Sequence, residues 1–282
     1  MIVVGAGTCG CRLAPYVGKA LGASRVVMVD TPDGIQSGES RAEKLGLKVS
    51  RVEVAYGSPT GAHRDYDGAL KEAEKSKALG ALRKQFVKAA KKAYKADRVP
   101  VIVWGLGGAT GAATAIKLGE EVPYACHVTI LPNYKADTEP IRKILDNAIK
   151  QLRTLMNRLE HHTVVTGDFA GVPVDKIGEE YAHALANRRD IVDKATAQNA
   201  NYVRKGDRKV RMVFLVNGAE LQRVQMGRLL RQLEELREGA EDFESADLAG
   251  SIQALDAGED VDLTIEAKDE DGKGDDWKDF FL

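Results

Sequence analysis

Two glycine-rich segments constrain the fold most, because each directly follows a short apolar run. The first is GAGTCG, residues 5–10, which reads G-x-G-x-x-G after the run Ile2–Val4. The second is GLGGATG, residues 105–111, which follows the wholly apolar run Pro100–Trp104. Glycine allows close approach of the backbone, and a helix that starts after such a loop offers free N–H groups. Each segment therefore predicts an anion-binding loop between a buried strand and a helix.

Strand and helix patterns alternate along the first 200 residues. The expected strands are Ile2–Val4, Arg25–Val29, Leu47–Val54, Pro100–Trp104, His127–Leu131 and Thr163–Val165. The expected helices are Cys11–Leu21, Asp65–Asp97, Ala112–Gly119, Glu139–Leu159 and Asp175–Gln198. This succession predicts an α/β fold, a Rossmann-like parallel sheet with helices on both faces. Such sheets bind ligands at the carboxyl ends of their strands, where both glycine segments fall.

The chain changes character after Gln198. A polar link, RKGDRK, precedes an expected strand Val210–Val216, a charged helix Leu221–Leu236 and a short strand Val261–Ile265. We therefore expect an α/β domain at 1–200 that includes the helix at 175–198, a reduced C-terminal α+β unit at 208–267, and an acidic mobile tail at 268–282. The tail ends in a group of apolar residues, which are Trp277, Phe280, Phe281 and Leu282.

Composition narrows the classes of partner. The 41 basic and 42 acidic residues nearly cancel, so the net charge predicts no nucleic-acid partner and no anionic membrane surface. No apolar run approaches the roughly 20 residues of a transmembrane helix, and no basic leader precedes the first strand. Cys9, Cys11 and Cys126 give no disulfide framework, and no second ligand pair at metal spacing accompanies Cys9 and Cys11. We expect a protein of the reducing cytoplasm.

Taken alone, the first glycine segment has another interpretation. G-x-G-x-x-G with an acid about 20 residues further on is the dinucleotide fingerprint, and Asp30 stands at that place. That pattern is typical of an NAD(P)-dependent oxidoreductase. A dinucleotide fold has no use for the second glycine segment, however, whereas two loops suit a ligand with several phosphates. Neither loop is a Walker A motif, since no Gly-Lys-Ser/Thr follows, so backbone N–H groups would hold the phosphates.

The order of these segments resembles the tubulin/FtsZ family of GTPases over about residues 1–200. GLGGATGAA is similar to the G-G-G-T-G-[TS]-G loop of the family. GAGTCGCR resembles the first phosphate loop of tubulin, with Thr8 and Cys11 where Gln and Asn usually stand. YGSPTGAHRDYDGALKEAE resembles the segment G-x-G-A-G-x-[ND]-P-x-x-G, and VTILPNYKADTEPIRK resembles the loop that contacts the ribose.

The resemblance implies GTP or GDP with Mg²⁺ as the ligand. The residues it implies near the phosphates are Gly5, Gly7, Thr8, Cys9, Gly10, Cys11, Asp30, Gly61, Ala62, Gly105, Gly107, Gly108, Ala109, Thr110 and Gly111. It implies Glu139 and Arg142 near the ribose, and Asp168 and Glu179 near the guanine base. Asp33 is as good a candidate as Asp30 for reaching Mg²⁺ through water.

Ordinary structural roles would also account for several of these residues. Thr110 suits the N-cap of the helix that follows it, and Glu139 suits an acid placed by the helix dipole. Glu179 suits a solvated helix acid. His63 and Arg64, which fall in the region of the γ-phosphate, suit a solvated turn.

In this family a loop after the core helix completes the active site of the next subunit in a head-to-tail filament, and its acid positions the attacking water. The corresponding run here is QNANYVRKGDRK, in which Asn201 stands at the acid position and Asp207 follows six residues later. The resemblance therefore implies a GTP-binding cytoskeletal protein that self-associates, with slow or assembly-dependent hydrolysis. The alternative is a non-polymerising regulator of a division or cytoskeletal partner, with the acidic-aromatic tail as a docking peptide.

Overall fold

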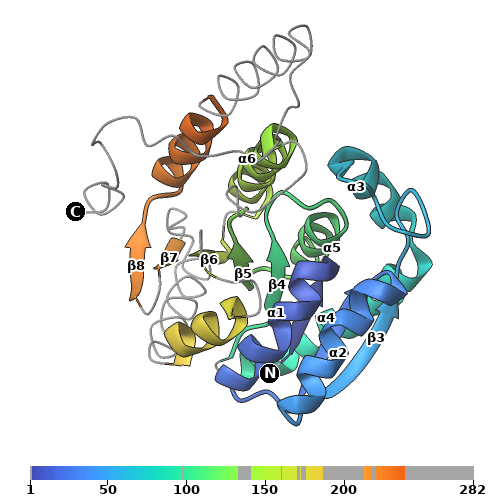
Figure 1. Cartoon of the computed structure of the whole chain (residues 1–282). Helices are drawn as coiled ribbons and strands as arrows, with labels where there is room; N and C mark the ends of the chain where they lie inside the picture. Colours follow the sequence, from blue (N-terminus) through green and yellow to red (C-terminus); the bar gives the residue numbers. More distant parts are fainter. Residues whose placement is uncertain are drawn as a thin grey trace, which may run out of the picture.

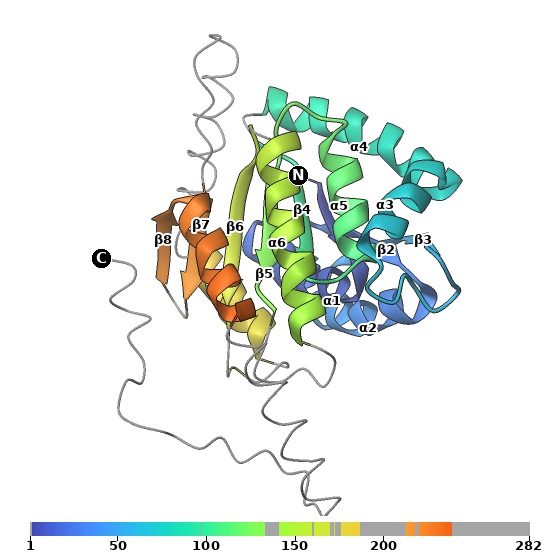
Figure 2. The ribbon, with the colours of Figure 1, turned by 90° about the horizontal axis from the view of Figure 1, so that it is seen from above.

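The structure is a computed structural model of the 282-residue chain, and it describes residues 2–96, 98–132, 141–159, 161–169, 172, 176–186, 213–217 and 220–238. The strands form one eight-stranded sheet in the order β3-β2-β1-β4-β5-β6-β7-β8. Every neighbouring pair is parallel except β7 and β8, which are antiparallel. Figures 1 and 2 place β3 and β8 at opposite ends of this sheet. The α/β class and the mostly parallel sheet are confirmed.

The strands are β1 Val3–Ala6, β2 Arg25–Asp30, β3 Lys48–Glu53, β4 Val101–Gly105, β5 Cys126–Ile130, β6 Thr163–Asp168, β7 Val213–Asn217 and β8 Glu220–Val224. The helices with named bounds are α1 Gly7–Ala20, α2 Pro32–Lys44, α3 Tyr66–Lys75, α4 Lys77–Lys95, α5 Thr110–Gly119 and α6 Ile141–Arg158. Residues 177–186 and 226–238 are also helical.

The sheet is the middle of three layers. Successive residues of β4 belong to opposite faces, since Val103 joins one buried cluster and Trp104 joins the other. The first cluster contains side chains of α1, α2 and residues 177–186. The second contains side chains of α3, α4, α5, α6 and residues 226–238. Burial on both faces explains why β4 is apolar throughout, as expected for a central parallel strand.

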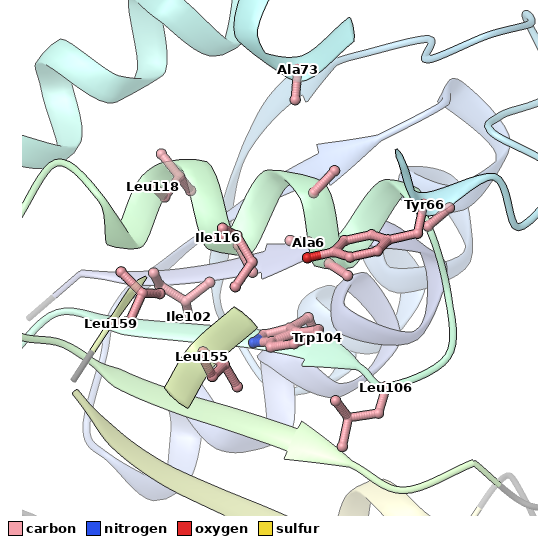
Figure 3. Close-up of a cluster of buried hydrophobic side chains, with 14 of the residues drawn as sticks. Ala6, Tyr66, Ala73, Ile102, Trp104, Leu106, Ile116, Leu118, Leu155 and Leu159 are labelled. Carbon is pink, nitrogen blue, oxygen red and sulfur yellow. The ribbon is translucent and has the colours of Figure 1, made fainter. Parts of the chain in front are cut away.

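Trp104 lies at the centre of the second cluster. Figure 3 shows its indole ring between α5, which supplies Ile116, and α6, which supplies Leu155. Trp104 is fully buried. A large ring at this point anchors both helices to β4, directly before the second glycine segment begins.

Two helices differ from the sequence expectations on the N-terminal side. The stretch expected as one helix, Asp65–Asp97, is α3 and α4, because the Ser76 side chain accepts a hydrogen bond from the Leu79 N–H and starts a new helix. The sequence did not suggest α2, whose glycines and serines are poor helix formers. Its small residues allow tight packing instead, since a Cβ on Gly38 would lie 2.3 Å from the carbonyl oxygen of Cys11 in α1.

The expected helix Leu221–Leu236 is wrong at its beginning. Residues Glu220–Val224 form β8, which pairs with β7, and the helix spans 226–238. Residues 220–224 pair with the edge of β7 instead of forming a helix. Buried apolar residues at helical spacing begin only at Met226. Strand β7 lies parallel to β6, so this part of the predicted C-terminal unit continues the N-terminal sheet. The expected strand Val261–Ile265, the tail at 268–282 and residues 187–198 lie outside the described residues.

Candidate functional site

The strand order reverses between β1 and β4. From β1 the chain builds outward through β2 to β3, and from β4 it builds in the other direction through β5 to β6. Ligands of open α/β sheets bind at such a switch point, outside the carboxyl ends of the strands. Ala6 pairs with Trp104 near the ends of the two strands, and each strand runs directly into a glycine segment. The fold therefore brings both predicted phosphate loops to the place where it favours a ligand.

The two glycine loops touch backbone to backbone. A Cβ on Gly7 would lie 2.7 Å from the Cα of Gly111. A Cβ on Gly111 would lie 2.5 Å from the carbonyl oxygen of Ala6. Gly7 also has a φ of +71°, which disfavours any other residue. A side chain at either glycine would push the two loops apart.

Glycines also seat α1 on β4. The helix begins at Gly7, four residues earlier than expected, so the last part of the first loop is already helical. A Cβ on Gly10 would lie 2.3 Å from the carbonyl oxygen of Val103, and one on Gly5 would lie 2.6 Å from the carbonyl oxygen of Gly10. The α1 N-terminus therefore lies directly against the strand that carries the second loop.

Helices α1 and α5 both begin at the switch point without a side-chain cap. Their N-cap residues are Ala6 and Ala109, and neither first turn contains an acidic residue. The Asp65 side chain caps α3, and the Ser76 side chain caps α4. The first-turn N–H groups of α1 and α5 therefore suit an anionic ligand.

Two amide side chains of α6 hold the second glycine loop, and the sequence analysis did not single them out. The fully buried Gln151 accepts a bond from the N–H of Gly107 at 2.8 Å and donates one to the carbonyl of Gly108 at 2.6 Å. Asn147 donates to the carbonyl of Gly107 at 3.2 Å. The N–H of Gly107 is thus bonded within the protein. The available signal was two amides four residues apart, on a helix whose inner face is otherwise apolar.

The segment 54–65 reaches the same place from β3. Gly61 has a φ of +111°, and a Cβ built on it would lie 3.7 Å from the Thr110 hydroxyl and 3.9 Å from the Thr31 side chain. Asn147 connects this segment to the second loop, because its amide also donates to the carbonyl of Arg64 at 2.9 Å. The predicted γ-phosphate segment and the second glycine loop therefore share one support.

The tip of that segment has an unusual backbone. His63 and Arg64 have φ values of 43° and 62°, although neither is a glycine. The Nε2 atom of His63 lies 3.0 Å from the hydroxyls of both Ser58 and Thr60. Ala62, the residue before His63, is buried. Left-handed non-glycine residues concentrate at functional sites, which makes this turn a candidate for ligand contact.

Asp30 is buried at the end of β2, with 3% of its surface exposed. One of its carboxylate oxygens accepts a bond from the Thr8 hydroxyl at 2.7 Å. Burial raises the pKa of Asp30, and the bond from Thr8 opposes that rise. A Cβ on Gly34 would lie 1.8 Å from the same oxygen. Asp30 therefore braces the first loop against α2, whereas Asp33 in the first turn of α2 is exposed.

The two threonines of α5 differ in their partners. The fully buried Thr114 hydroxyl lies 3.1 Å from the hydroxyl of Tyr56, which is also buried. Thr110 is half-buried, and its hydroxyl has no hydrogen bond to another part of the chain that the structure describes. Because Ala109 is the N-cap, Thr110 is the first residue of α5 and does not cap it.

The cysteines of the first loop are structural in different ways. The buried Cys11 thiol donates to the carbonyl of Gly5 at 3.6 Å, and burial raises its pKa. Cys9 is exposed, and its sulfur would lie 2.9 Å from a Cβ on Gly105. Nowhere in the described part of the chain do three His, Cys, Asp or Glu side chains gather as they would around a metal ion.

The residues predicted near the ribose and base are spread along the other side of the site. Arg142 is exposed in the first turn of α6, and Asp168 ends β6 at the carboxyl edge of the sheet. Glu179 is exposed on the helix at 177–186. Three other predicted residues lie outside the described residues, and these are Glu139, Asn201 and Asp207.

The helix that carries Glu179 is fixed on the same face as α1. A Cβ on Gly178 would lie 2.4 Å from the ring of Tyr16 in α1. The buried Tyr181 hydroxyl lies 2.8 Å from the carbonyl oxygen of Thr129 and 3.0 Å from that of Val165. The start of the expected core helix is therefore held between α1 and strands β5 and β6.

On the second face of the sheet, buried polar side chains form a continuous series of hydrogen bonds, which was not predicted from the sequence. The Trp104 indole N–H donates to Nδ1 of His127 at 3.2 Å, so the proton of His127 lies on Nε2. That nitrogen lies 3.1 Å from Nδ1 of His162, whose Nε2 lies 3.3 Å from the carbonyl oxygen of Val122. Burial and the neighbouring His162 hold the pKa of His127 well below its usual value. His127 is therefore a neutral core residue.

No protein-family model matches the sequence, and no curated protein matches it. Within the described residues, no helix combines the length and the apolar character needed to cross a membrane.

Proposed function

We propose that this chain binds GTP or GDP with Mg²⁺ at the switch point between β1 and β4, as a self-associating cytoskeletal protein similar to FtsZ and tubulin. The observation that carries the proposal is the contact of Gly7 with Gly111, with an uncapped helix N-terminus on each side. Two positive helix ends at one point suit a chain of phosphates, which carries several negative charges.

In this proposal the backbone supplies most phosphate contacts. The first-turn N–H groups of α1, from Thr8 to Gly10, and those of α5 face the phosphates, and the Thr110 hydroxyl donates a further bond. Gly61 and Ala62 close the γ-phosphate side. Mg²⁺ usually takes phosphate oxygens, water and one or two carboxylates. Asp33 could supply one, because it is exposed in the first turn of α2, just after β2. The ribose and base contacts of Arg142, Asp168 and Glu179 rest on the family resemblance.

An NAD(P)-dependent oxidoreductase is the second candidate, because the order of β3 to β6 is also that of dinucleotide folds. Those folds use the acid after the second strand to bind the ribose. Here Asp30 is buried and bonded to Thr8, which favours a bracing role. In addition, a dinucleotide would need only the first glycine loop, whereas a ligand with several phosphates could contact both loops.

Binding is tested by the melting temperature of the purified chain with GTP, GDP, ATP, NAD or NADP, each with Mg²⁺. A ligand at 100 times its dissociation constant stabilises by about 2.7 kcal/mol. Stabilisation by guanine nucleotides alone supports the proposal, whereas stabilisation by NAD or NADP alone overturns it.

Two threonine variants place the ligand. Thr110→Val removes a hydroxyl that has no partner in the described part of the chain, so it should cost little stability but weaken GTP binding about tenfold. Thr114→Val is the matched control, because it breaks the bond to Tyr56 and should lower stability by about 1 kcal/mol with GTP binding unchanged. If Thr114→Val weakened GTP binding and Thr110→Val did not, the phosphates would not lie at the start of α5.

Hydrolysis and assembly form a separate test. Transfer of the γ-phosphoryl group to water would rely on backbone N–H groups and Mg²⁺ for charge stabilisation. Because Asn201 stands at the family's acid position, we expect slow phosphate release. Asn201→Asp should accelerate this release, and the rate per molecule should then increase with protein concentration. Sedimentation with and without GTP separates a filament former from the non-polymerising regulator. No sedimentation at any nucleotide would favour the regulator.

A further inference from the structure

Helix α4 carries a strongly basic surface that the proposed nucleotide site does not use. Its 19 residues include seven basic residues and no acidic residue. One of the seven, Arg83, pairs with Glu121 of the α5–β5 connection. The other six are exposed lysines, which we call the α4 lysine face: Lys77, Lys84, Lys88, Lys91, Lys92 and Lys95. None of the six forms an ion pair within the described residues.

The lysines line one side of the helix. Lys77, Lys84 and Lys91 are seven residues apart, and Lys88 and Lys95 repeat the same interval beside them, which places all five along one stripe. The opposite side of α4 packs into the second core cluster through apolar side chains such as Phe86. At about 1.5 Å per residue the face is about 27 Å long. It is therefore a long cationic strip on a fixed support.

The chain itself contains the complementary charge. Residues 239–282 include 15 acidic and three basic residues, a net charge of −12. Residues 1–238 include 38 basic and 27 acidic residues, a net charge of +11. The near-zero total charge thus hides two parts of opposite sign, which attract each other.

We propose that the acidic segment 239–282 docks along the α4 lysine face of its own chain. The helix at 226–238, from which this segment continues, packs in the same core cluster as α4, so the segment starts on the side of the sheet that α4 covers. A random coil of 44 residues has a root-mean-square span of about 35 Å, long enough to reach along the α4 lysine face. Tethering gives an effective concentration in the millimolar range, which favours the same chain over a second copy. The docked segment shields α4 from other polyanions.

Zero-length carbodiimide cross-linking of the full chain tests this directly, because it joins a carboxylate to an amine with no spacer and so requires the two groups to come into contact. At low salt we expect cross-links from acidic residues of 239–282 to the α4 lysine face, and at least tenfold fewer at 1 M salt, where the Debye length falls to about 3 Å. A mixture of light and ¹⁵N-labelled protein separates links within one chain from links between copies. Links only between copies would overturn the assignment to the same chain.

Charge reversal provides a second measurement on the full chain. Lys84→Glu, Lys88→Glu, Lys91→Glu and Lys95→Glu together should lower the yield of links from the acidic segment to the remaining lysines of α4 about tenfold. The matched control reverses Lys19, Lys44 and Lys48, which are exposed on other elements, and should leave that yield unchanged. Equal links to all exposed lysines would overturn the proposal. It would also fail if the wild-type chain bound single-stranded DNA or anionic vesicles through the α4 lysine face as tightly as a variant with neutralised tail acids.

Discussion

Two groups of polar atoms in this sheet differ in whether the protein itself supplies their hydrogen-bond partners. Beneath the second face, the hydrogen bonds run from Trp104 through His127 and His162 to the Val122 carbonyl, and every ring nitrogen is used. At the switch point, α1 and α5 begin without caps, and the Thr110 hydroxyl has no partner in the described part of the chain. The first arrangement satisfies its own polar groups, whereas the second leaves donors that are available to a ligand.

The helix starts repeat this contrast. Helices α3 and α4, away from the switch point, begin at Asp65 and Ser76, whose side chains bond the first-turn N–H groups. Helix α2 has no side-chain cap either, but its first turn contains Asp33. Among helices α1 to α5, α1 and α5 are the ones with neither a side-chain cap nor a first-turn acid, which leaves their first N–H groups available to an external acceptor. Local rules of stability are most often broken at functional sites. The contrast therefore points to the switch point as the site of function.

The largest effect is expected where the two glycine loops touch. Gly111→Ala places a Cβ 2.5 Å from the Ala6 carbonyl oxygen, so it should lower the free energy of unfolding by about 3 kcal/mol and abolish the GTP-dependent melting shift. The measurement is urea unfolding with and without nucleotide. The control is Gly80→Ala in α4, where a Cβ meets nothing within 4 Å and should add about 0.5–1 kcal/mol. Equal results for both variants would contradict the loop contact.

The next effect concerns the support of the second loop. Gln151→Leu keeps the approximate size of the side chain but leaves the buried N–H of Gly107 and the half-buried carbonyl of Gly108 without their partner, which should cost about 2 kcal/mol. Nucleotide affinity should fall with it, because the loop loses its fixed shape. Gln85→Leu on the exposed side of α4 is the control and should stay within about 0.5 kcal/mol of the wild type. An unchanged affinity in Gln151→Leu would show that the loop holds its shape without α6.

Sequence patterns predicted the sheet and the two loops well, because each rests on residues that are neighbours in the chain. Apolar runs predicted most of the strands from β1 to β7, alternation of apolar and polar residues predicted β3, and glycine spacing predicted both loops at the switch point. The contact between Gly7 and Gly111 could be expected only in outline, since it depends on the β1–β4 register. That register is set by the whole sheet.

Features that depend on distant partners were missed. Helix α2 forms because glycines allow it to pack on α1, and β8 forms because the edge of β7 is free, so neither follows from local propensity. Gln151 and His127 looked like ordinary residues of a helix and a strand, and only the fold brings them to Gly107 and to His162. Asp30 fitted a ribose contact in sequence, and its bond to Thr8 became visible only with the loop folded back.

The hydrogen-bond series through His127 predicts that the free energy of unfolding depends on pH. Burial lowers the pKa of His127 below its unfolded value of about 6.5, so the unfolded state binds more protons, and stability is lost as the pH falls below 6.5. Between pH 6.5 and 5.5 the loss should be about 1 kcal/mol. His127→Gln should be less stable at neutral pH but lack this loss. The raised pKa of Asp30 makes the folded state more stable as the pH falls, which is the opposite effect. This contribution is the same in the wild type and in His127→Gln, so it cancels in the difference between them. Equal slopes would contradict a neutral buried His127.

The smallest effect tests the capped helices against the uncapped ones. Ser76→Ala removes the cap of α4 and should cost about 0.5–1 kcal/mol, measured by urea unfolding. The stabilisation by saturating GTP should remain the same as in the wild type, because this cap and the glycine loops share no hydrogen-bond partner and independent effects add. A smaller increment in Ser76→Ala would mean that α4 takes part in ligand binding. The donors of α1 and α5 would then no longer stand apart from those of α3 and α4, and the contrast that locates the site would be lost.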